Sequence, residues 1–175
     1  MIALKNSKER LSLEKLKPHH ANHLYEMMLD KNMYNYIPDD PPPSLTTLQD
    51  KYTMLENGSL REEELWLNYA VFILKEKVYI GTLQATVLTR ERVILVAYLI
   101  NSKYWGKGYG VEALNLMLKS LDREYKNYRY QAYTDTRNFR SKKLLEKLDF
   151  KCIDLIKDAD FFKGSTSHEY LYEKI

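Results

Sequence analysis

The stretch from Arg92 to Leu121 constrains the fold most, because it predicts a strand, a turn and a helix in direct succession. Residues 93–100 form an apolar run with β-branched residues on both alternating faces, which is typical of a strand covered on two sides. A glycine-rich turn follows, and apolar residues then recur at the 3.6-residue period of a packed helix. The periodic positions are Ala113, Leu114, Met117, Leu118 and Leu121.

The turn contains Gly106, Gly108 and Gly110, and it has the properties of an anion site. Glycine permits positive φ and close approach of a ligand to the main chain. The first amides of the following helix have no internal partner and carry the positive end of its dipole. The spacing matches neither the P-loop nor the Gly-x-Gly-x-x-Gly dinucleotide pattern. A tight connection without a ligand contains similar glycines, so the spacing alone leaves both interpretations open.

The order of predicted elements indicates an α/β fold. We expect strands at 11–16, 66–74, 78–88, 93–100, 128–134, 150–156 and 170–175, and helices beginning near 18 and 44, after the glycine turn, and near 138. A strand-helix-strand crossover beside hairpin strands predicts a mixed central sheet of about six to seven strands flanked by about four helices. The length of 175 residues suits one domain over residues 1–175.

Charge and cysteine content limit the partners and the compartment. Lys and Arg number 27 against 24 Asp and Glu, a balance that argues against nucleic acid. The lone Cys152 cannot form an internal disulfide, which favours a reducing compartment. Charges at Lys5, Lys8 and Arg10 interrupt any signal-peptide run, and no stretch reaches membrane-spanning length. We therefore expect a cytoplasmic protein that binds neither nucleic acid nor membrane.

The run Tyr104–Tyr109 resembles the acetyl-CoA-binding motif of the GNAT acetyltransferase superfamily, in the branch of the ribosomal-protein N-terminal acetyltransferases. The general pattern is Arg or Gln, two residues, Gly, one residue, then Gly or Ala. Trp105 stands here in its first position, and Gly108 and Gly110 in the glycine positions. The predicted element order is also that of the GNAT fold, so the resemblance covers nearly the whole chain. It implies an acetyl-CoA-dependent N-acetyltransferase.

The resemblance assigns the acetyl-CoA site to three segments. The backbone of the central strand would hold the thioester carbonyl, the turn would hold the diphosphate, and the helix from Asn138 would contact the pantetheine arm. The assigned residues are Tyr98, Leu99, Ile100, Trp105, Gly106, Lys107, Gly108, Tyr109, Gly110, Val111, Asn138 and Ser141. Without the resemblance, Asn138 is simply a helix cap. The basic residues Arg140, Lys142 and Lys143 either meet the 3′-phosphate or form a solvated helix face.

The acid and base are less defined. Many GNAT enzymes carry a tyrosine acid where this chain has Leu145, and the resemblance transfers the role to Ser141, whose alternative is a capping or CoA-contacting hydroxyl. His168, which we place at the head of the last strand, and Glu169 are candidate bases, since histidine titrates near neutrality. An N-terminal α-amine, with a pKa of roughly 7.7 to 8, needs little help from a base.

The acceptor is a primary amine, and a protein N-terminus is favoured by the resemblance. Tyr36, Asp39 and Asp40, on the irregular stretch 33–43, either bind a cationic amine or belong to a polar linker. A small amine or aminoglycoside acceptor, and a catalytically silent acyl-CoA sensor, are the alternatives. A homodimer is possible. His19 and His23 share a helix face without a third ligand, so we expect no metal.

Overall fold

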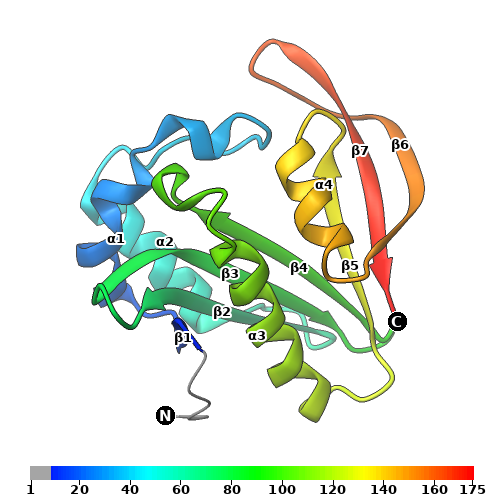
Figure 1. Cartoon of the computed structure of the whole chain (residues 1–175), viewed down its shortest axis with the longest axis horizontal. Helices are drawn as coiled ribbons and strands as arrows, with labels where there is room; N and C mark the ends of the chain where they lie inside the picture. Colours follow the sequence, from blue (N-terminus) through cyan, green and yellow to red (C-terminus); the bar gives the residue numbers. More distant parts are fainter. Residues whose placement is uncertain (1–8) are drawn as a thin grey trace.

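The protein forms a seven-stranded mixed sheet in the order β1-β2-β3-β4-β5-β7-β6 (Figure 1). The computed structural model describes residues 9–175, so Lys5 and Lys8 lie outside the described residues. The strands are β1 Leu11–Lys15, β2 Glu64–Ile73, β3 Val78–Leu88, β4 Val93–Ile100, β5 Arg129–Asp135, β6 Lys151–Phe162 and β7 Ser165–Lys174. The helices are α1 Ala21–Met28, α2 Leu45–Asn57, α3 Tyr109–Glu124 and α4 Phe139–Glu146, and 3-10 turns span Pro18–His20, Lys31–Tyr34 and Ser102–Tyr104. The predicted fold class is confirmed.

Helices cover both faces of the sheet. Alternation along β2 sends Ala70 into a core with α1 and α2, and its neighbour Val71 into a larger core with α3 and α4. The larger core contains Leu114 of α3 and Leu145 of α4. In Figure 1, α3 crosses the side of the sheet opposite α1 and α2. No helix within residues 9–175 is long and apolar enough to cross a membrane.

The two central strands separate along their length. β4 and β5 are the parallel neighbours of the sheet, and their pairing extends only from Val93 to Leu95 on β4. Figure 1 shows the two strands diverging beyond this point. From Val96 onward the edge of β4 that faces β5 has no strand partner in the described part of the chain, although Ile100 O accepts a hydrogen bond from Trp105 Nε1 at 2.7 Å. Buried backbone groups need partners, so the remaining groups of this edge could be paired by a ligand.

The last two strands are longer than the sequence suggested. β6 continues to Phe162 instead of ending near 156, and β7 begins at Ser165 instead of 170. His168 therefore lies inside β7, not at its head. Positive φ at Lys163 (50°) and Gly164 (76°) closes the β6–β7 hairpin in two residues, as a type I′ turn requires.

A buried histidine makes stability depend on pH. His20 is 1% exposed; its Nδ1 accepts the Lys17 amide at 2.9 Å and its Nε2 lies 3.3 Å from Glu14 Oε2. Burial lowers the pKa of His20 from 6.5. The unfolded chain therefore binds a proton before the folded chain does, and stability is lost as the pH falls below 6.5. We expect a loss of at most about 1.4 kcal/mol per pH unit in urea unfolding.

The control for this prediction is the exposed His23. His20→Gln should flatten the pH dependence between 7.5 and 5.5, whereas His23→Gln should leave it as in the parent protein. An unchanged slope in His20→Gln would show that another group carries the effect.

Candidate functional site

A cavity of about 350 Å³ lies between the end of β4, the glycine turn and α4. Every residue predicted to contact the cofactor lines it, except Lys107. Those residues are Tyr98, Leu99, Ile100, Trp105, Gly106, Gly108, Tyr109, Gly110, Val111, Asn138 and Ser141. The structure thus brings the three predicted segments together around one space.

The glycines of the turn are required for different reasons. Gly106 and Gly108 have φ of 74° and 81°, and Gly108 is the N-cap of α3. A Cβ at Gly110 would lie 2.7 Å from Leu144 Cδ1, so this glycine permits close packing of α3 on α4. Together they expose the start of α3 to the cavity.

The cavity is suited to a polyanion. Glu112 N makes the first α3 hydrogen bond, to Gly108 O at 3.1 Å, so the amides of residues 109–111 lack helical partners. The cavity is also lined by Arg140, Lys143 and Lys147, and by no carboxylate from residues 9–175. Arg140 lies 4.2 Å above the Trp105 ring. Such a set of donors fits phosphate groups.

Of the three basic residues predicted to meet the 3′-phosphate, only Arg140 and Lys143 line the cavity. Lys142 does not line the cavity, because its ammonium lies over the rings of Phe139 at 5.3 Å and Tyr170 at 4.6 Å. Lys147, one turn after Lys143, lines it instead. The helical period explains the exchange, since residues three and four apart share a helix face.

Arg10 supports the glycine turn from outside the helix, and sequence reasoning missed it. Its Nε and Nη2 each lie 2.7 Å from Glu112 Oε2, and its backbone amide donates to Oε1 at 2.8 Å. Its Nη1 donates to Lys107 O at 3.2 Å, and its guanidinium lies 4.4 Å from the Tyr109 ring centroid. Arg10 therefore neutralises the one carboxylate in the first turn of α3.

Ser141 is held on two sides at the cavity wall. Asn138 Oδ1 caps α4 by accepting the Ser141 amide at 3.1 Å. The Ser141 hydroxyl lies 2.7 Å from the Tyr98 hydroxyl, which comes from β4. Leu145 is fully buried in the core, so this position contributes packing and no acid.

A second cavity, of about 420 Å³, lies on the α1 and α2 side of the sheet. It shares Tyr98 and Leu99 with the first cavity, so the two meet at β4 where β5 departs. Asp39 and Asp40 line it, whereas Tyr36 lines the first cavity. Each of the two carboxylates faces a lysine: Asp39 faces Lys51 at 2.8 Å, and Asp40 faces Lys163 at 3.4 Å.

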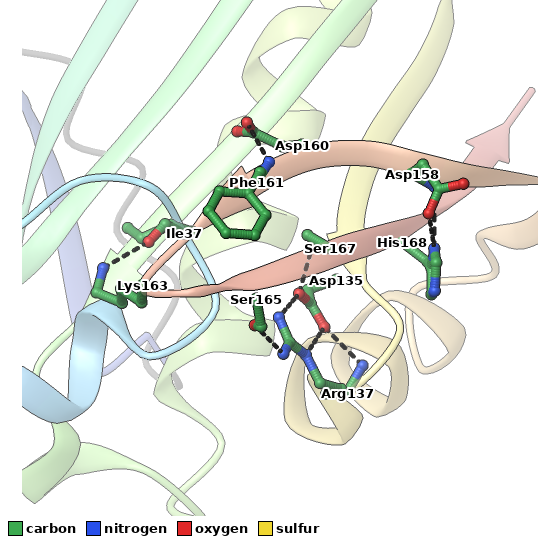
Figure 2. Close-up of polar contacts among 10 residues, drawn as sticks. All are labelled: Ile37, Asp135, Arg137, Asp158, Asp160, Phe161, Lys163, Ser165, Ser167 and His168. Carbon is green, nitrogen blue, oxygen red and sulfur yellow. Dashed lines mark hydrogen bonds and ion pairs between the residues drawn. The ribbon is translucent and has the colours of Figure 1, made fainter.

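The β6–β7 hairpin is tied to the loop that precedes α2. Lys163 Nζ donates to Ile37 O and to Asp39 O, both at 2.8 Å. Figure 2 shows Lys163 at the hairpin end reaching the loop at Ile37. This contact links the β6–β7 hairpin, on one side of the gap between β4 and β5, to the loop before α2 on the other side.

A buried carboxylate fixes the end of β5. Asp135, 3% exposed, accepts hydrogen bonds from Arg137 Nε at 2.9 Å and Nη2 at 2.6 Å, and from Ser167 Oγ at 2.8 Å (Figure 2). Arg137 also donates to Ser165 at 3.0 Å. Burial acts to raise the pKa of Asp135, but the hydrogen bonds from Arg137 and Ser167 lower it overall. The network joins β5, the start of α4 and β7.

The candidate bases lie beside this network. Glu169 pairs with Asp135 across the β5–β7 ladder, and their side chains share a face. Burial first, then the charges of Asp160 and Asp135, raise the pKa of Glu169. His168 points to the opposite face, where its Nδ1 accepts the Asp158 amide at 2.9 Å (Figure 2). Neither His168 nor Glu169 lines the two cavities.

Known proteins share both the sequence and the fold. The acetyltransferase (GNAT) domain family model matches residues 10–151. An uncharacterised N-acetyltransferase of Bacillus licheniformis is 24% identical over 165 residues, which cover 94% of this chain and 92% of the relative.

Two solved structures show how widely the fold is used. An acetyltransferase of Salmonella typhimurium that modifies the N-terminal serine of ribosomal protein L7/L12 has a TM-score of 0.83, at 15% identity and 96% coverage of each chain. A spermidine N-acetyltransferase of Vibrio cholerae, solved with CoA and spermine, has a TM-score of 0.79, at 16% identity, with 94% of this chain and 95% of that chain covered. By the family match, this chain is an acyltransferase that belongs to the GNAT acetyltransferase domain family.

Proposed function

We propose that this enzyme transfers the acetyl group of acetyl-CoA to a primary amine, with a protein N-terminus as the favoured acceptor. The observation that carries the proposal is the meeting of two cavities at Tyr98 and Leu99 of β4. One is cationic and reaches the start of α3. The other lies on the opposite side of the sheet. Donor and acceptor bound in this way would meet at β4, which suits direct attack in a ternary complex.

Each part of acetyl-CoA has a candidate partner in the first cavity. The amides at the start of α3 would bind the diphosphate, and Arg140, Lys143 and Lys147 would bind the 3′-phosphate. The β4 edge beyond Leu95 has backbone groups without strand partners within the described chain. They would bind the thioester carbonyl, where fixed donors stabilise the developing negative charge.

Proton transfer in the proposal uses one group that lines the donor cavity and one that lies outside both cavities. Ser141 lines the donor cavity and is the candidate acid for the leaving sulfur. Glu169 is the favoured candidate base, because burial raises its pKa and it pairs with Asp135 across the β5–β7 ladder, on the face of the sheet opposite His168. His168 faces away and is engaged by Asp158. An acceptor α-amine that is already partly neutral at pH 7 to 8 reacts without help from Glu169 or His168.

The charge of the second cavity favours an acceptor with one amine over a polyamine. Its carboxylates, Asp39 and Asp40, already face Lys51 and Lys163. Most of its other lining residues are apolar, including Leu48, Leu55 and Pro43. A polycation such as spermidine would find little free negative charge there. A peptide N-terminus brings one amine with an amphipathic chain.

A panel of amines tests the proposal. Thiol release from acetyl-CoA is followed with peptides that begin with Ser, Ala or Met, with spermidine, and with an aminoglycoside, and acetylated products are identified by mass spectrometry. We expect release with peptides and acetylation of their α-amine. Release with spermidine or the aminoglycoside alone would replace the protein acceptor with a small amine. CoA binding without release in any arm would indicate a silent acyl-CoA-binding module.

Arg10 gives a prediction on donor affinity. In Arg10→Met, Glu112 keeps its charge at the start of α3 and Lys107 O loses a donor. Negative charge there opposes a bound diphosphate. We expect the Kd for CoA, measured by calorimetry, to rise about tenfold, a difference of about 1.4 kcal/mol.

The double variant Arg10→Met with Glu112→Gln is the control for this prediction. Removing both charges should restore much of the affinity. If the double variant binds CoA as poorly as Arg10→Met, Arg10 acts through the shape of the turn and not through charge.

A further inference from the structure

We propose that Tyr98 is a positioning residue for acetyl transfer: its phenol donates a hydrogen bond to Ser141 Oγ and directs the single Ser141 proton toward the leaving sulfur. The Tyr98 hydroxyl lies 2.7 Å from Ser141 Oγ, and both residues line the donor cavity. This inference rests on the proposed function. It adds Tyr98, from β4, to the proton transfer from Ser141, in α4, to the leaving sulfur.

Two oxygen atoms of Ser141 lie within reach of the Tyr98 hydroxyl. The Tyr98 hydroxyl also lies 3.5 Å from Ser141 O, and a carbonyl oxygen only accepts. The phenol has one proton, and we place it on the shorter contact, with Ser141 Oγ at 2.7 Å as the acceptor. A serine hydroxyl has one proton, so this arrangement leaves that proton free for another acceptor. Burial raises the pKa of Tyr98, which keeps the phenol protonated and able to donate.

Ser141 is oriented by this contact together with its cap. Asn138 Oδ1 holds the Ser141 amide at 3.1 Å, which fixes the backbone at the first turn of α4. Tyr98 then fixes the side chain from the other wall of the cavity. Leu145, one turn later in α4, is fully buried and carries no donor. Hence the hydroxyl that supports Ser141 comes from β4.

The contact lies where the reaction would take place. Tyr98 lines both cavities, and it belongs to the part of β4 beyond the pairing with β5. The other tyrosines at the turn are engaged by cations: Lys107 lies over the Tyr104 ring at 5.3 Å, and Arg10 over the Tyr109 ring at 4.4 Å. Tyr98 thus reaches the junction of the two cavities with its hydroxyl paired to that of Ser141.

The step balances without another reactant. The amine nitrogen forms a bond to the acetyl carbon with its lone pair and gives up one proton. The carbon–sulfur bond breaks and its electron pair stays on sulfur. Ser141 donates its proton along a hydrogen bond to that sulfur and recovers one from solvent, so the products are an amide and a thiol. Tyr98 keeps its own proton throughout and acts only through Ser141.

A double-mutant cycle tests the role of Tyr98. Steady-state kinetics with an amine found active in the panel are compared for the parent enzyme, Tyr98→Phe, Ser141→Ala and the double variant, and CoA binding is measured by calorimetry. We expect kcat to fall about tenfold in Tyr98→Phe and about a hundredfold in Ser141→Ala. KM for acetyl-CoA and the Kd of CoA should stay within about twofold of the parent values. In the Ser141→Ala background, Tyr98→Phe should change kcat by less than about twofold.

Several outcomes would overturn the inference. Parent-like kcat in Tyr98→Phe would show that the phenol is not needed, and an equal tenfold loss in the Ser141→Ala background would show a structural effect. A weaker Kd with unchanged kcat would make Tyr98 a binding residue. Tyr125→Phe, at the far end of α3 and outside both cavities, is the control for loss of a tyrosine hydroxyl. A parent enzyme inactive on every amine would instead remove the proposed function itself.

Discussion

Replacing Gly108 with valine is expected to weaken CoA binding at least a hundredfold while leaving the sheet intact. Gly108 has φ of 81° as the N-cap of α3, and a residue with a Cβ pays about 1–2 kcal/mol to stay there. The turn would relieve this strain by rotating the amides of residues 109–111 away from the cavity. An added Cβ would lie 3.5 Å from Arg10 Nη2, which is an ordinary contact, so the expected effect comes from the backbone. The measurement is calorimetry with CoA on protein whose circular dichroism matches the parent.

Gly58 provides a matched control for this substitution. It has φ of 82° after the end of α2, and nothing lies within 4 Å of an added Cβ. Gly58→Val therefore also places a Cβ at positive φ, at a position that lines neither cavity, and its ψ of −172° against 0° at Gly108 makes the backbone strain at least as large. CoA affinity should be unchanged in Gly58→Val. Parent-like affinity in a folded Gly108→Val would show that the start of α3 does not hold the diphosphate.

The fold was largely predictable because its central elements carry strong local patterns. The apolar run of β4 and the 3.6-residue period of α3 reflect burial on both faces of the sheet. The hairpin of β6 and β7 was shortened in the prediction because β6 is an exposed edge strand. The residues Lys157, Asp158 and Asp160 are exposed, and register shifts interrupt the pairing of β6 with β7. Neither feature produces an apolar alternation.

The donor side of the candidate site was predictable because it is built from two short contiguous segments. The glycine turn and the start of α4 carry their own signals, in glycine spacing and in the cap at Asn138. The supporting contacts join residues far apart in the chain. Arg10 and Glu112 are 102 positions apart, and Lys163 and Ile37 are 126 apart. Only tertiary structure brings them together.

The contact of the Tyr98 side chain with Ser141 could not be predicted from the sequence either. The family resemblance places Tyr98 in the acetyl-CoA site only through its backbone, which would hold the thioester carbonyl. Strand alternation sends its side chain to the α3 and α4 side of the sheet, beside Ser141. The distance between the two hydroxyls depends on how far β4 and β5 have diverged, and no local pattern encodes that divergence. The sequence therefore indicates the segments of the site better than the contacts between them.

Asp135→Ala is expected to lower the free energy of unfolding by about 3 kcal/mol and to reduce acetyl transfer strongly. The substitution leaves Arg137 and the buried Ser167 without their shared partner at the end of β5, and breaking a buried pair on one side costs about 3–5 kcal/mol. The lower end applies because the Arg137 side chain is 44% exposed and regains water. Activity falls because Arg137 immediately precedes Asn138, whose cap fixes Ser141.

Urea unfolding at several pH values separates this effect from a general loss of packing. Because the pKa of Asp135 is lowered in the folded state, its contribution is fully present above its ordinary value of 3.8 and is lost as the pH falls through the lowered pKa. The parent and Asp135→Ala curves should therefore converge in acid. Glu63→Ala, which removes a carboxylate 63% exposed and 3.7 Å from Arg90, should change stability little at any pH. If the difference between parent and Asp135→Ala persists unchanged in acid, the carboxylate charge is not what holds β5, α4 and β7 together.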